Sequence, residues 1–260
     1  MKARANGIEI SYELHGPESA PWLVLSHSLA CSVRMWDPQI AALAREFRIL
    51  AFDTRGHGAS DAPEGEYTLE QLADDLKGLL EHLRVKSAHY CGLSMGGMIG
   101  QTFALKYPGV LRTLTLADTA SRYPKEAWPT WQERIRIAQT QGMAPLAQPT
   151  LERWFTAPFR DRNPGVVEAV RALIVSTPVA GYVGCCHAIP KIDLTARLKE
   201  IKCPILVIVG ADDPGTPVSM AREIHENAPG SKLVVLPQAA HLANLEQPEA
   251  FTKALAGFIS

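Results

Sequence analysis

Short apolar runs that recur along the chain give the first indication of its fold. They show little alternation of apolar and polar positions, and each is about as long as a strand. Runs of this kind are typical of strands that are covered on both faces, as in a parallel sheet. We therefore predict buried strands at Trp22–Leu25, Ile49–Phe52, Leu114–Leu116, Ile205–Val209 and Leu233–Leu236.

Between some of these runs, apolar side chains follow the three-and-four spacing of amphipathic helices. Thr68 and Gln71 form a capping box at the start of the clearest segment, whose apolar positions are Leu69, Leu72, Ala73, Leu76, Leu79, Leu80 and Leu83. The last segment has Pro248 near its start and places Phe251, Leu255, Phe258 and Ile259 on one side. Alternating strands and helices predict an α/β fold, with a mostly parallel central sheet flanked by helices.

The alternation breaks between residues 122 and 190. Strand-like runs disappear there, prolines are scattered, and three of the five tryptophans fall within the segment. It carries eight basic and five acidic side chains, although the whole chain is nearly neutral. We predict that 122–190 is a helical cap inserted into a core formed by 1–121 and 191–260.

Composition narrows the possible partners. The 260 residues include 26 basic and 27 acidic side chains, which gives a net charge of -1 and no indication of nucleic acid or an anionic membrane as a partner. No secretory signal or membrane-spanning run is recognisable. The five cysteines lack metal-type spacing, so we expect a cytoplasmic protein with no metal. The sequence leaves the oligomeric state open.

The stretch CGLSMGGMIG, from Cys91 to Gly100, carries the clearest chemical signal. Ser94 stands between Gly92 and Gly96, after a predicted strand at 87–91 and before a predicted helix at 95–106. A tight strand-to-helix turn with small flanking residues is the setting of a nucleophile elbow, which presents a reactive serine. The stretch fits neither a phosphate-binding loop nor the dinucleotide glycine spacing. We predict that Ser94 is a nucleophile.

A serine nucleophile needs a base and an acid that orients the base. His241 follows one predicted strand, and Asp213 follows another, so both should lie at the ligand-binding edge of the sheet. Asp213 is the favoured acid because it lies in a loop that enters a helix; Asp118 and Asp212 are the alternatives.

Attack of a serine on a carbonyl group places negative charge on the carbonyl oxygen, and backbone N–H groups are expected to bind that oxygen. One should belong to Met95, the residue after the nucleophile, and the other to Leu29, in the loop after the first apolar run. The turn from Asp53 to Ser60 is predicted to be architectural and tied together by Asp53 and Arg55. His27 and His57 could each serve a structural hydrogen bond or catalysis.

Several segments together resemble the α/β-hydrolase superfamily and, within it, the 3-oxoadipate enol-lactonases. The resemblance covers nearly the whole chain and rests on SHSLACSVRMWDPQ, DTRGHGASDAPEGEYTLEQLADDL, CGLSMGGMIGQ, LERWFT, GYVGCCHAI and AAHLANLEQPEAFT. It implies a serine hydrolase that needs no cofactor and opens a carboxylate-bearing enol-lactone during aromatic acid breakdown. By this likeness Ser94, Asp213 and His241 form the triad, and Trp154 lines the pocket under the cap. Ala30 departs from the pattern, since similar enzymes commonly have glycine there.

Other functions stay open at this level. A general carboxylesterase and a carbon–carbon bond hydrolase of ring-cleavage products share the same motifs, although Leu242 stands where the latter group often has tryptophan. A lactone-binding receptor with slow residual hydrolysis is the non-enzymatic alternative. Arg153 and Arg134 are candidates to bind the carboxylate of a substrate.

Overall fold

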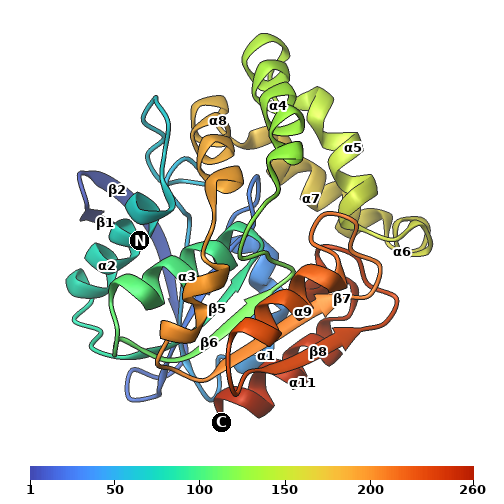
Figure 1. The fold of residues 1–260 in the computed structure, drawn as a ribbon. Coiled ribbons are helices and arrows are strands. Elements are labelled where there is room, and N and C mark those ends of the chain that lie inside the picture. Colours follow the sequence, from blue (N-terminus) through green and yellow to red (C-terminus); the bar gives the residue numbers. More distant parts are fainter.

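An eight-stranded sheet forms the centre of the protein, whose computed structural model describes residues 1–260 (Figure 1). Its strands are β1 (Lys2–Ala5), β2 (Ile8–His15), β3 (Trp22–Ser26), β4 (Arg48–Phe52), β5 (Ala88–Leu93), β6 (Leu111–Ala117), β7 (Ile205–Gly210) and β8 (Lys232–Leu236). They lie in the order β1-β2-β4-β3-β5-β6-β7-β8. β2 pairs antiparallel with β1 and β4, and every other pair is parallel. The predicted mostly parallel sheet is confirmed.

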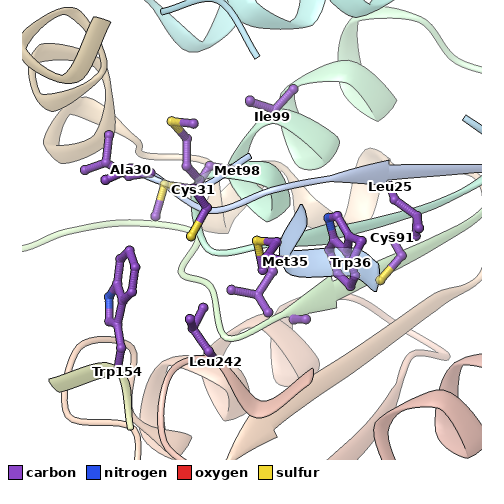
Figure 2. Packing of buried hydrophobic residues seen from close by; sticks show 14 of the residues in the cluster. Leu25, Ala30, Cys31, Met35, Trp36, Cys91, Met98, Ile99, Trp154 and Leu242 are labelled. Carbon is purple, nitrogen blue, oxygen red and sulfur yellow. The ribbon is translucent and has the colours of Figure 1, made fainter. Parts of the chain in front are cut away.

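Apolar side chains on the two faces of the sheet form two buried clusters. Leu23 and Leu25 of β3 belong to one cluster and Val24 to the other, because successive strand residues point to opposite faces. The Val24 face is covered by α2 (Leu69–His82), α3 (Met95–Lys106) and α9 (Val218–Asn227), and the opposite face by α1 (Asp37–Leu43) and α11 (Pro248–Ile259). Figure 2 shows part of the second cluster, where Trp36 lies near Leu25 and Cys91.

Most predicted elements are present, with two differences. The apolar runs all fall within strands, and the Thr68 side chain caps α2 by accepting a hydrogen bond from the Gln71 N–H at 3.0 Å. β1 and β2 were not predicted, because their side chains alternate between buried and exposed and form no continuous apolar run. β8 was expected to be buried on both faces, but it is an edge strand and Val235 is exposed.

Five helices lie between β6 and β7 in the chain: α4 (Trp128–Gln141), α5 (Ala144–Trp154), α6 (Ala157–Arg162), α7 (Pro164–Ser176) and α8 (Val179–Ala188). They gather at one end of the molecule, at the top of Figure 1. At their base, the backbones of Arg122 and Asp193 form an isolated antiparallel β-bridge, and the Leu194 N–H donates to the Ser121 carbonyl at 2.8 Å. The entering and leaving chain segments therefore lie side by side, and we propose residues 122–190 as a cap on this basis.

No single helix has both the length and the apolar character needed to cross a bilayer. α7 and the segment Val179–Lys191 meet those two criteria only as a pair, which bends by 91° at its break. Val170, Ile174 and Tyr182 of this pair are buried in the protein.

Candidate active site

Ser94 lies in a sharp turn between β5 and α3. Its φ of 55° and ψ of -113° are unusual for a residue with a side chain, so the fold holds this residue in a strained conformation. The flanking glycines are required by close packing: a Cβ on Gly92 would lie 2.3 Å from the Gly96 carbonyl oxygen, and one on Gly96 would lie 2.2 Å from that of Ser26. Strand, turn and helix are therefore arranged as an elbow that presents the Ser94 hydroxyl.

Asp213 and His241 meet at the carboxyl ends of β7 and β8. The His241 Nδ1 atom lies 2.8 Å from Asp213 Oδ2, and both side chains are buried. Asp213 also accepts hydrogen bonds from the Thr216 hydroxyl at 2.6 Å and the Gly215 N–H at 2.8 Å. Burial opposes ionisation of Asp213, but the charge of His241 and these hydrogen bonds outweigh it and lower its pKa. The acid is thus held as a carboxylate beside the imidazole.

Ser94 and His241 line the same cavity, which has a volume of about 230 Å³. The Ser94 hydroxyl makes no hydrogen bond within the chain, and the hydrogen bonds of the His241 ring lead to Asp213 and Thr216. Nucleophile and base often tighten their contact only when a substrate is bound. The predicted nucleophile and the predicted base, which are far apart in sequence, therefore face one cavity.

The two alternative acids occupy different settings. Asp212 is exposed, in contrast to the buried Asp213 and His241. Asp118 is fully buried after β6 and accepts a hydrogen bond from the Gly210 N–H at 2.7 Å, without contacting His241. Burial, followed by the nearby charge of Asp213, raises the pKa of Asp118 well above its usual value. Its contacts support the start of the loop that carries Asp213.

Leu29 and Met95 lie where the predicted N–H donors are needed. Leu29 lines the cavity, and its N–H has no acceptor within the chain. Met95 is the first residue of α3, where backbone N–H groups have no partner within the helix. The next residue in the first loop, Ala30, has a φ of 57°, a conformation that glycine adopts more readily. The departure from glycine at Ala30 is thus accommodated with local strain.

Two buried histidines hold the loop around Leu29. His57 Nε2 accepts from the Ala30 N–H at 3.0 Å, and His27 Nδ1 lies 2.7 Å from the Ser28 carbonyl oxygen. The Nε2 atom of His27 accepts from the Thr54 N–H, so its Nδ1 atom carries the proton and donates to Ser28. Neither ring lines the catalytic cavity, which favours the structural interpretation over catalysis.

The prediction that Asp53 and Arg55 tie this turn together is correct for Asp53 and wrong for Arg55. Arg55 instead forms a buried pair with Asp75 of α2, with contacts of 2.6 and 2.7 Å. Asp53 accepts from the N–H groups of Val33 and Ala59, each at 3.0 Å. The turn is architectural: Asp53 closes it through Ala59 and joins it to Val33, whereas Arg55 joins it to α2.

A pH titration of stability tests the neutral state of these histidines. Burial lowers the pKa of His27 to about 4 and that of His57 to about 3, whereas the unfolded chain binds these protons near pH 6.5. Proton binding therefore favours the unfolded state in this range. As the pH falls from 7 to 5, each of the two histidines should lower the free energy of unfolding by about 2 kcal/mol. Urea unfolding of His57→Gln should show a pH-dependent loss about 2 kcal/mol smaller than that of the wild type. Exposed His82→Gln serves as the control, and an unchanged loss in His57→Gln would contradict the assignment.

The proposed cap supplies the roof of the cavity. Trp154 of α5 stacks over His241 with a ring separation of 6.0 Å, and its carbonyl accepts from the Leu242 N–H at 3.1 Å. Figure 2 shows the Trp154 indole directed toward the loop that contains Ala30, and both residues line the cavity. Sequence reasoning singled out Trp154 but missed the other aromatic lining residues, Tyr123, Trp131 and Tyr182.

Glu246 of α10 (Ala243–Glu246) was also missed. One of its carboxylate oxygens accepts from both the N–H and the hydroxyl of Thr156 at 2.9 Å, and the other accepts from the Ala240 N–H. This side chain therefore connects the segment after α5 with the residue before His241. No local motif marks it, because Thr156 is 90 residues away in sequence and Ala240 contributes only a backbone N–H.

A serine at a strand-to-helix elbow, with a buried histidine and carboxylate at the same edge of a mostly parallel sheet, is typical of the α/β-hydrolase class. The chain belongs to the alpha/beta hydrolase fold family, whose model matches residues 21–248. It is 37% identical to 3-oxoadipate enol-lactonase 2 of Acinetobacter baylyi over 96% of this chain and 93% of that protein.

Solved structures give the same picture. The enol-lactonase from Burkholderia xenovorans LB400 superposes with a TM-score of 0.96 at 41% identity, covering 100% of this chain and 99% of that one. A thermophilic esterase from Thermogutta terrifontis, solved with malate bound, has a TM-score of 0.95 at 31% identity and covers 100% and 98% of the two chains. The chain is thus similar to both lactonases and an esterase.

Proposed function

We propose that the protein hydrolyses an enol-lactone, specifically 3-oxoadipate enol-lactone, in the breakdown of aromatic acids. The observation that carries this proposal is the shared cavity of Ser94 and His241, with Asp213 bonded to the far side of the imidazole. The likeness to enol-lactonases over nearly the full chain supports the choice of substrate.

In the first step, His241 takes the proton of the Ser94 hydroxyl as the serine oxygen attacks the lactone carbonyl. Asp213 stabilises the resulting imidazolium through its bond to Nδ1. The N–H groups of Leu29 and Met95 bind the negative oxygen of the tetrahedral intermediate, where one such donor contributes about 3 kcal/mol.

Collapse of the intermediate breaks the ring carbon–oxygen bond and leaves an acyl group on Ser94. The leaving oxygen belongs to an enol, and an enolate leaves more readily than an alkoxide, so proton donation by His241 matters less than in ordinary ester hydrolysis. The imidazolium then gives its proton to the released enolate, so His241 is neutral again, and water attacks the acyl group with His241 as the base. Ser94 regains its proton, and the enol product becomes the ketone.

A general carboxylesterase is the second candidate, favoured by the likeness to the Thermogutta esterase. A carbon–carbon bond hydrolase is less well supported, because the residue after His241 is the buried Leu242, where that group often has tryptophan. A lactone-binding receptor with the same side chains would differ from the enzyme only in its rate.

Steady-state kinetics with the enol-lactone and with para-nitrophenyl acetate tests the substrate assignment. We expect the lactone to have a kcat/KM at least about 100-fold higher, because the acetate ester lacks the ring and the carboxylate that the pocket is proposed to recognise. Equal values would favour the carboxylesterase. Turnover slower than about one product per protein per minute would favour the receptor.

A further inference from the structure

Two arginines stand where the catalytic cavity meets the surface of the proposed cap. Arg134 of α4 and Arg153 of α5 line the cavity that holds Ser94 and also a second hollow of about 450 Å³ between α4 and α5. Thr130, Leu146 and Thr150 line both spaces as well. The two hollows are therefore neighbours, and Arg134 and Arg153 form part of the wall between them.

Neither guanidinium has a carboxylate partner. The acidic side chains nearest in sequence are engaged elsewhere: Glu133 binds Arg136 at 2.6 and 2.8 Å, and Glu152 accepts from Gln148 at 2.7 Å. Arg153 has only a long contact of 3.3 Å with the Thr150 hydroxyl, and Arg134 lies over the Trp131 ring at 4.6 Å. Both positive charges are left without a counterion inside the chain.

This arrangement is unfavourable for the empty protein. Arg134 and Arg153 are both partly withdrawn from water, and burial together with the charge of Arg134 lowers the pKa of Arg153. Surface arginines usually avoid this cost by pairing or by extending into solvent. Two like charges held at the wall of the cavity that contains Ser94 are explained if the counterion arrives with the substrate.

We propose that Arg134 and Arg153 form an anion-selective entrance that binds the carboxylate of an ester or lactone substrate while its carbonyl lies at Ser94. Planar guanidinium groups match a carboxylate with paired hydrogen bonds, and the Trp131 ring holds Arg134 in place. The inference rests on the proposed function, because it assigns the charged end of the molecule that Ser94 attacks.

The test compares two probes that differ only in one charge. Para-nitrophenyl hydrogen adipate carries a free carboxylate, and its methyl ester has the same reacting carbonyl and leaving group without the charge. For the wild-type protein we expect kcat/KM to be at least about tenfold higher for the anion, the size of one charge-assisted hydrogen bond. The preference should shrink with added salt, because ions screen exposed charges.

Arg134→Gln and Arg153→Gln should each lower the ratio of the two kcat/KM values at least about fivefold, and the double variant should bring it near one. The ratio cancels any loss of activity that both probes share. Arg136→Gln is the matched control: this arginine lies on the same helix, is exposed, and is bound to Glu133 away from the cavity. It should keep the wild-type ratio.

Binding of adipate, measured by calorimetry, separates the entrance from the reaction. Weaker adipate binding in both arginine variants, with wild-type affinity in Arg136→Gln, supports the entrance even if no probe is turned over, in which case only the proposed function fails. If the esters are hydrolysed, a wild-type ratio near one, or a ratio that survives in the double variant, overturns the entrance. If they are not hydrolysed, wild-type adipate affinity in both arginine variants overturns it.

Discussion

Ser94→Ala is expected to lower kcat/KM for the enol-lactone by about 10⁴-fold or more, because the hydroxyl that attacks the carbonyl is removed. Stability should change by less than about 1 kcal/mol, since the Ser94 hydroxyl makes no hydrogen bond in the chain. Steady-state kinetics and urea unfolding of the same preparation measure the two effects. Some hydrolysis above the uncatalysed rate should persist, because the N–H groups of Leu29 and Met95 remain.

Ser219→Ala provides a control, since this serine lies exposed on α9, outside the cavity. It should retain wild-type kinetics and stability. A Ser94→Ala protein that folds normally and keeps more than about a tenth of the activity would mean that another group attacks the substrate.

Asp213→Asn should lower kcat by about 10³- to 10⁴-fold, whereas Asp118→Asn should cost less than about tenfold. An asparagine at position 213 replaces the negative charge that pairs with the His241 imidazolium, so the base loses both its orientation and its stabilisation. Asparagine at position 118 keeps an oxygen that can accept from the Gly210 N–H, and Asp118 forms no hydrogen bond with His241.

The two variants are compared in parallel by their kcat values with the enol-lactone, after thermal unfolding has verified that each is folded. Both aspartates are buried at the same edge of the sheet, but only Asp213 is hydrogen-bonded to His241. The ranking of the two variants therefore tests this hydrogen bond and not burial. A larger loss in Asp118→Asn would transfer the role of the acid from Asp213 to Asp118.

The sequence was sufficient for the elements that carry the predicted triad. Continuous apolar runs mark buried parallel strands, and strands of this kind bring their carboxyl ends to one edge, so Asp213 and His241 could be placed together from their positions after two runs. The glycines around Ser94 were informative because backbone atoms approach within van der Waals distance at Gly92 and Gly96.

Long-range contacts account for what the sequence did not reveal. Arg55 binds Asp75, which is 20 residues away in sequence, and Glu246 binds Thr156, which is 90 residues away. The roof of the cavity depends on how α4 and α5 pack, and helical periodicity does not specify that packing. For the same reason Arg134 could be named as a candidate, but not as a partner of Arg153.

Labelling with a fluorophosphonate tests the central claim most directly, since this reagent forms a stable bond only with an activated serine. Peptide mass spectrometry should find one adduct per chain, on Ser94, and His241→Ala should slow its formation by at least about 10³-fold because the base is lost. An adduct on a different residue, or equally fast labelling of Ser94 without His241, would contradict the claim that this histidine activates this serine.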